Sequence, residues 1–102
     1  MSRREQLESM LADTPGDTFL RYALAMEWAN EDEHEKSLTM HRELMNDTPQ
    51  YVPSFFMSGQ LLAELERIDE AQSVLQAGIA QADTQGNTHA AGEMRQFLDT
   101  LD

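Results

Sequence analysis

The chain has 102 residues, of which 40% are hydrophobic, and this size fits a single small domain with a modest core. It contains no cysteine, so disulfide frameworks, thiolate metal sites and cysteine nucleophiles are excluded. Nineteen acidic and seven basic residues give a formal net charge of −12, which disfavours nucleic-acid binding because such a surface repels phosphate backbones. The same acidity favours solubility, and it would attract a basic partner at low salt.

Apolar residues recur at spacings of three and four along the chain, which predicts an all-α fold. A first helix begins after Ser2, which forms a capping box with Glu5, and ends before the turn at 13–16. The side chains expected on its inner face are Leu7, Met10 and Leu11. The N-terminal segment lacks the apolar stretch of a signal peptide, and no later run has the length of a membrane span. We therefore expect a cytoplasmic protein without a membrane partner.

The second helix is capped by Asp17 or Thr18 and runs to about Asn30. It is apolar over a wide arc, which indicates contacts on two sides. Its two stripes are Leu20, Leu24 and Trp28 on one side and Phe19, Tyr22 and Met26 on the other. The acidic stretch 31–33 leads into a third helix, which stops before Pro49. The inward positions expected on the third helix are Ser37, Leu38, His41, Leu44 and Met45.

The fourth helix has Pro53 in its first turn, where proline is tolerated. Its expected inner residues are Phe55, Gly59, Leu62 and Leu65. A fifth helix spans roughly 69–82, with a buried seam of Ala71, Leu75 and Gly78. Residues 83–87 break the pattern, and Thr88 caps a last helix. The side chains expected to face inward from the last helix are Ala91, Met94, Leu98 and Leu101.

The sequence resembles itself after a shift of 34 residues. The tripeptide Asp-Thr-Pro at 13–15 recurs at 47–49. The same shift places small residues on small ones and bulky residues on bulky ones at most positions. Examples are Leu24-Ala25 onto Ser58-Gly59, Trp28 onto Leu62, Ser37 onto Ala71 and Met45 onto Ile79. A period of this length is typical of a repeated pair of helices.

These positions resemble the tetratricopeptide-repeat (TPR) family, whose 34-residue unit has an aromatic residue, a Leu-Gly pair, a tyrosine, an alanine, a second aromatic residue and a proline. The unit at 18–51 matches through Leu24-Ala25, Trp28, Ser37 and Pro49, and has Arg21 and His41 in place of the two aromatic residues. The unit at 52–85 matches through Phe55, Gly59, Leu62, Ala71 and Leu75, and departs at Ser58, Gly78 and Asp83. Because the terminal proline is missing at 83, the exit from the second unit can be longer.

The resemblance implies one TPR-like domain over 1–102, an all-α helix-turn-helix repeat solenoid. Applied backwards, the period makes 1–16 the second half of a truncated repeat, followed by full repeats at 18–51 and 52–85 and a C-terminal capping helix in 86–102. About three repeats are usually needed for stability, so the terminal helices, or a second chain, must cover the ends. The usual work of such a scaffold is to hold a peptide or a protein.

The residues indicate no reaction chemistry. His34 and His41 are seven residues apart, about 10 Å along a helix, which is too far for one metal ion. We interpret His41 as a packed core residue and His34 and His89 as surface residues. No phosphate-binding glycine loop, nucleophile with a base, or singled-out carboxylate pair is present. We predict no cofactor, no metal and no catalytic residue, so that an enzyme is a remote alternative.

The resemblance places the binding surface on the first helix of each unit, because these helices form the concave face of TPR proteins. The predicted partner-binding residues are Phe19, Tyr22, Met26, Phe56, Met57 and Gln60. Rigid aromatic rings and adaptable methionines suit an apolar peptide or helix. Tyr22, Met26 and Met57 stand where some relatives have lysine and asparagine that clamp a C-terminal carboxylate, so binding of that kind is not supported.

Two alternatives remain open from the sequence. The aromatic stripe can pack against the first or last helix of its own chain instead of a partner. It can also pair two copies of the chain, which would make the protein a self-association module.

Overall fold

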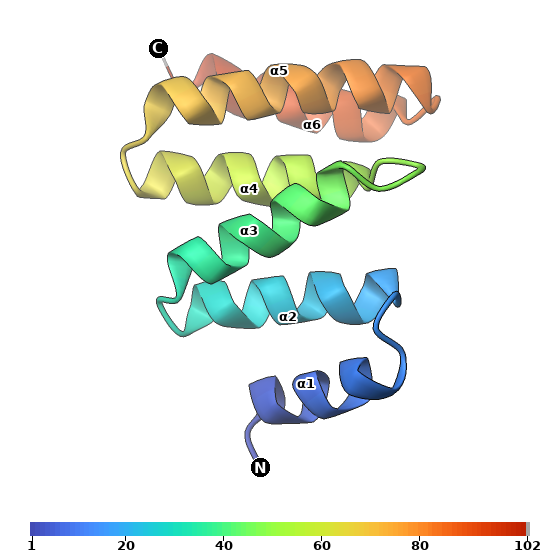
Figure 1. The fold of residues 1–102 in the computed structure, drawn as a ribbon. Coiled ribbons are helices and arrows are strands. Elements are labelled where there is room, and N and C mark those ends of the chain that lie inside the picture. The colour runs from blue at the N-terminus through green and yellow to red at the C-terminus, as the bar shows by residue number, and fades with distance from the viewer. Residues whose placement is uncertain (102) are drawn as a thin grey trace.

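In the computed structural model, which describes residues 1–101, the chain forms six helices stacked in chain order (Figure 1). The helices are α1 (Arg3–Asp13), α2 (Thr18–Asn30), α3 (His34–Met45), α4 (Val52–Glu64), α5 (Ile68–Thr84) and α6 (Thr88–Asp99). The array is elongated, with extents of 41 × 29 × 18 Å. No strand occurs within residues 1–101, and the predicted all-α repeat fold is confirmed.

Helices α1, α2 and α6 begin at residues whose side chains cap them. Ser2 and Glu5 form the predicted capping box, and the Asp17 carboxylate accepts a hydrogen bond from the Leu20 amide at 2.9 Å. The prediction that Thr88 caps the last helix is wrong by one residue. Asn87 is the cap, because its side chain accepts a hydrogen bond from the Ala90 amide at 3.1 Å and Thr88 already belongs to the helix.

Helix α5 is longer than its counterpart α3, with 17 residues against 12. The predicted end at about Ala82 is therefore two residues early. Pro49 follows α3, whereas Asp83 stands at the equivalent position and is itself helical. Since no proline interrupts the chain there, the helix continues to Thr84. The prediction of a longer exit from this helix pair is wrong: the connection at 85–87 is shorter than the one at 46–51, because α5 itself extends over the positions equivalent to 46–50.

The paired helices cross closely at small residues. Ala25 of α2 and Ser37 of α3 are buried, and the Ser37 hydroxyl donates a hydrogen bond to the Ala25 carbonyl at 2.7 Å. In the next pair, Gly59 of α4 and Ala71 of α5 occupy the equivalent buried positions. A Cβ atom on Gly59 would lie only 2.7 Å from the Leu75 side chain, so this crossing requires glycine.

Gly78 departs from the first unit, which has buried Leu44 at the equivalent position. The structure explains the exchange. A Cβ atom on Gly78 would lie 2.5 Å from Cβ of Phe55 and 2.7 Å from Sδ of Met94. Phe55 stands where the first unit has Arg21, which turns to the Asp47 carboxylate at 2.7 Å. In the second helix pair, Phe55 and Met94 therefore fill the space that a side chain on residue 78 would need.

The two ends of the array are covered differently. Helix α1 packs on α2 through buried Leu7, whereas Met10, predicted to face inward, is 52% exposed. The prediction fails because α1 has a packed neighbour on one side, along the stripe from Leu7 to Leu11, and Met10 lies beside that stripe. Helix α6 ends the array with a polar outer side, on which His89, Glu93, Arg95 and Gln96 are exposed. A polar outer face is what a terminal helix of a solenoid needs.

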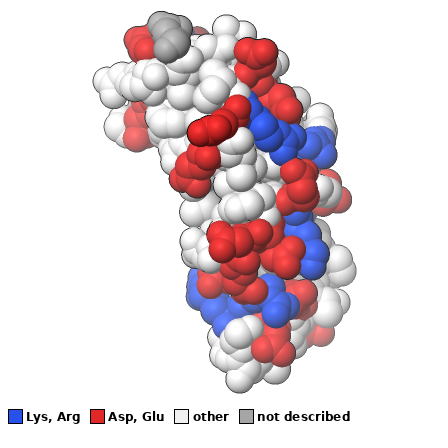
Figure 2. Space-filling view, turned by 90° about the vertical axis from the view of Figure 1, so that its left-hand side faces the viewer, with Lys and Arg blue, Asp and Glu red and all other residues white. Residues whose placement is uncertain are grey.

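Ion pairs connect successive helix pairs on the side where the α2–α3 and α4–α5 turns lie. Arg4 of α1 contacts Glu31 at 2.9 Å, and Arg67 contacts Glu35 of α3 at 2.7 Å. Figure 2 views this side and shows acidic and basic side chains interleaved along the molecule. These pairs are partly exposed, so solvent and salt screen them.

We predict that Gly78→Ala lowers the free energy of unfolding by roughly 1–3 kcal/mol, because the methyl group would enter space held by Phe55 and Met94. Gly92→Ala in α6 is the matched control. Its Cβ atom would meet nothing within 4 Å, so alanine there should be neutral or stabilise the helix by up to about 1 kcal/mol. Urea unfolding followed by circular dichroism measures both, and equal effects would contradict the packing explanation.

The turns inside the two helix pairs hold non-glycine residues in the left-handed region, with φ of 61° at Asp32 and 62° at Glu66. We predict that Glu66→Gly is more stable than Glu66→Ala by about 1 kcal/mol, because only glycine adopts this backbone without steric cost. Both variants lose the same carboxylate, so thermal unfolding isolates the backbone contribution. A Glu66→Ala variant as stable as Glu66→Gly would show that the turn is not strained.

Candidate functional site

Helices α2 and α4 run in the same direction, with α3 crossing between them (Figure 1). A hollow of about 150 Å³ lies among these three helices. We call it the methionine hollow, because Met26 of α2 and Met57 of α4 line it together. Its lining residues are Met26, Ala29, Asn30, Ser37, His41, Met57, Gln60, Leu61 and Glu64. Three of the six predicted partner-binding residues, Met26, Met57 and Gln60, are brought together here.

His41 of α3 belongs to the floor of the methionine hollow, and its side chain is buried, with 2% of the residue exposed. Its Nδ1 atom shares a hydrogen bond of 2.9 Å with the Ser54 hydroxyl of α4. Burial lowers the pKa of His41 from 6.5 to about 4, so the imidazole is neutral at pH 7. The floor is therefore polar in composition but carries no charge, and the His41–Ser54 bond ties α3 to α4 beneath it.

Tyr22 and Phe56, two further predicted residues, pack against their own chain. The Tyr22 ring meets the rings of Tyr51 and His41 edge-on, with centroids 5.2 and 5.7 Å apart. Burial, and secondly the neighbouring Tyr51, raise the pKa of Tyr22. Phe56 meets Phe97 of α6 edge-on at 6.0 Å. The alternative that the stripe packs against the first or last helix of its own chain therefore holds for Phe56, whereas Tyr22 packs on α3 and on the start of α4.

Phe19, the sixth predicted residue, is 71% exposed near the start of α2 and does not line the methionine hollow. Sequence reasoning missed the polar residues at the other end of the same helices. Asn30 and Glu64 are the last residues of α2 and α4, and both line the hollow. They are also 34 residues apart, and each lies one helical turn after Met26 or Gln60. Following the same helix faces for one more turn would have found them.

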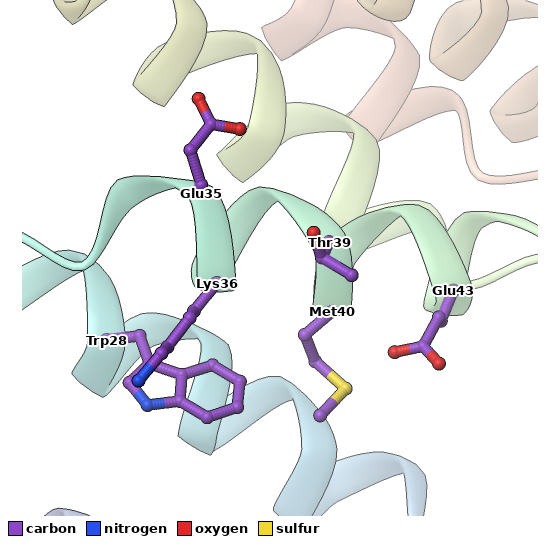
Figure 3. Close-up of a pocket in the computed structure, with 6 residues that line it drawn as sticks. All are labelled: Trp28, Glu35, Lys36, Thr39, Met40 and Glu43. Carbon is purple, nitrogen blue, oxygen red and sulfur yellow. The ribbon is translucent and has the colours of Figure 1, made fainter.

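A second hollow lies on the outer side of α3, and we call it the tryptophan hollow. It measures about 290 Å³ and is lined by Trp28, Glu35, Lys36, Thr39, Met40 and Glu43. Figure 3 shows Lys36 and Met40 pointing from α3 toward Trp28, while Glu35 points away. A counterpart of about 210 Å³ occurs 34 residues later, with Leu62, Glu70, Ser73 and Val74 in its lining. Because the feature recurs with the period, we attribute it to repeat packing rather than to a specialised site.

Three further observations concern metal ligands, membrane-spanning helices and the remaining histidines. Within residues 1–101 no three histidine or acidic side chains are grouped so that they could hold a metal ion. None of the helices formed by these residues has the length and apolar character needed to cross a membrane. His89 is exposed, whereas His34 is partly buried and its Nε2 atom lies 3.8 Å from an Asp32 oxygen, so the surface interpretation of His34 is only partly correct.

No family model matches the chain, and no curated protein matches it. The chain does match solved structures. A tetratricopeptide-repeat domain protein from Salinibacter ruber, solved by NMR, is 31% identical over 86% of this chain and 89% of that chain, with a TM-score of 0.80. A crystal structure of a tetratricopeptide-repeat domain protein from the same organism is 30% identical over 83% of this chain and 96% of that chain, with a TM-score of 0.74.

A protein from Bordetella parapertussis, solved in solution, is 25% identical over 99% of this chain and 88% of that chain, with a TM-score of 0.84. The fold and the Salinibacter ruber similarities together define a helical repeat scaffold. The chain belongs to the tetratricopeptide-repeat family.

We predict that the free energy of unfolding falls as pH drops from 6.5 toward 4, because the unfolded chain then takes up a proton that folded His41 excludes. The stabilisation is complete above pH 6.5, and its loss is at most roughly 3 kcal/mol, from about 1.4 kcal/mol per pKa unit. His41→Phe should remove this part of the pH dependence, whereas His89→Gln, at an exposed site, should keep it. Urea titrations at pH 7 and pH 4.5 measure the difference; the same loss in both variants would contradict the assignment to His41.

Proposed function

We propose that this protein is a binding scaffold that holds a segment of another protein in the methionine hollow. The observation that carries the proposal is the convergence of Met26 and Met57, which come from different helix pairs, over an uncharged floor. Methionine adapts its shape to an incoming apolar side chain. The Gln60 amide beside them offers a donor and an acceptor to the backbone of the bound segment.

The size of the hollow favours a side chain over a small molecule. Its volume of about 150 Å³ lies below the roughly 300–1,000 Å³ that small-molecule sites usually have. The floor of the hollow is held in place without a ligand. Ser37 is hydrogen-bonded to Ala25 of α2, and His41 is hydrogen-bonded to Ser54 of α4. A preformed floor reduces the conformational cost of binding. This favours a partner that inserts a single apolar side chain into the open side of the hollow.

The proposal includes no catalysis, in keeping with a fold that typically serves as a scaffold. His41, the buried titratable residue at the hollow, is neutral and has a pKa of about 4. A general base at neutral pH works best with a pKa near 7, so this imidazole is poorly suited to proton transfer.

The proposal predicts that Met57→Glu weakens the binding of peptides selected on the unmodified protein. The probes are phage-displayed random dodecapeptides selected on the immobilised full chain, then synthesised with a fluorescent label. Met57→Glu should weaken binding at least tenfold in fluorescence anisotropy, because it puts a charge on an apolar wall. Met40→Glu, which alters the tryptophan hollow, is the matched control. Loss of binding in Met40→Glu alone would reject the methionine hollow as the site.

Self-association is a second candidate function, favoured by the large exposure of Phe19 near the start of α2. Light scattering after size exclusion, at low and at molar salt, separates the two functions. The scaffold proposal expects a monomer of 11.6 kDa at all concentrations. A dimer that persists in molar salt and dissociates in Phe19→Ser would instead establish apolar pairing of two copies.

A further inference from the structure

The methionine hollow is asymmetric in charge along its length, and this asymmetry defines a partner chemistry. We propose that the bound segment carries a lysine or arginine beside its apolar anchor, and that this cation lies between Asn30 and Glu64. The inference rests on the proposed function, because it concerns the same hollow. It adds the sign of the partner's charge and the direction in which the segment lies.

The Asn30 and Glu64 end of the hollow is negative for two reasons. Asn30 and Glu64 end two helices that run in the same direction, so both helices direct the negative end of their dipole there (Figure 1). Glu64 is exposed and takes part in no ion pair among the residues that the structure describes. A carboxylate without a cation and two helix C-termini are the environment that a lysine or arginine side chain prefers.

The basic side chains near this end are engaged with other acids. Arg4 contacts Glu8 and Glu31, both within 2.9 Å. Arg67 contacts Glu35 at 2.7 Å and Glu70 at 2.8 Å. Lys36 lies 4.0 Å from Glu33. None of these three cations forms an ion pair with Glu64.

The opposite end of the same two helices is not negative in the same way. Their N-termini present the positive end of each dipole, which the Asp17 cap offsets at α2, and the Arg21–Asp47 pair at 2.7 Å lies there without a net charge. An anionic side chain at the Asn30 and Glu64 end would be repelled, and a cationic one attracted. The electrostatic pattern therefore selects both the partner's sign and its orientation.

The helix geometry sets the spacing between anchor and cation. Met26 and Asn30 are four residues apart and Met57 and Glu64 are seven apart, or about 6 and 10 Å along a helix axis. An extended segment covers this distance in about two or three residues, at roughly 3.3 Å each. A helical segment covers it in about four to seven residues. The partner should carry its basic residue at one of these spacings from a leucine, methionine or isoleucine.

The test compares peptide selection on three full-length proteins: the unmodified chain, Glu64→Lys and Glu43→Lys. Glu43 is the matched control, because it is an exposed carboxylate of α3 that lines the tryptophan hollow. The probes are the same random dodecapeptides displayed on phage. Circular dichroism checks that each variant keeps its helices.

We expect the unmodified chain and Glu43→Lys to enrich peptides with lysine or arginine at the stated spacing from an apolar residue. Glu64→Lys should enrich aspartate or glutamate at that position instead. A selected basic peptide should bind Glu64→Lys roughly 5- to 20-fold more weakly than the unmodified chain in low salt, with the difference shrinking in molar salt.

The outcomes separate this inference from the function on which it rests. Peptides that need Met57 but show the same charge preference on Glu64→Lys overturn the inference and leave the scaffold function in place. A reversal of charge preference in Glu43→Lys instead of Glu64→Lys also overturns it. Enrichment of no peptide above the empty support would contradict the scaffold function itself.

Discussion

The close crossing of paired helices at small residues is the constraint on which the rest of the structure depends. Ser37 donates its hydroxyl to the Ala25 carbonyl, and Gly59 leaves room for Leu75. A larger residue at these crossings would separate the two helices of a pair. Because the crossings are close, the next pair can pack on α3, and residues of α2 and α4 reach one hollow. The packing of the repeats and the geometry of the candidate site therefore depend on the same helix crossings.

His41 shows how a departure from the family pattern can serve the fold. The pattern favours an aromatic residue at this position, where an imidazole offers a similar ring and an additional hydrogen bond. That bond goes to Ser54, so α3 of one pair is tied to α4 of the next. The same imidazole forms part of the hollow floor and is neutral because it is buried. Stability and the proposed binding thus depend on one buried polar pair.

A terminal helix lies at each end of the short array. At the C-terminal end, α6 covers Phe56 with Phe97 and presents a polar outer side. At the N-terminal end, α1 contributes buried Leu7 together with ion pairs to α2. In our proposal the site between these ends holds one anchor and one charge. Discrimination between partners would then depend on the sign of that charge more than on contact area.

The sequence by itself determined the all-α repeat, the Ser2 cap and the burial of His41, because periodicity and capping are local properties of the chain. It left Asp17 and Thr18 as alternative caps of the second helix, and the structure has Asp17. The sequence also predicted a longer exit from α5, but the helix extends instead and the connection after it is shorter. Which predicted binding residues meet was decided only by the tertiary structure. Met26 and Met57 converge, whereas Phe56 meets α6 and Tyr22 meets Tyr51. Residues on one helical face have the same period but different neighbours, and those neighbours are fixed by helix crossings that no local pattern encodes.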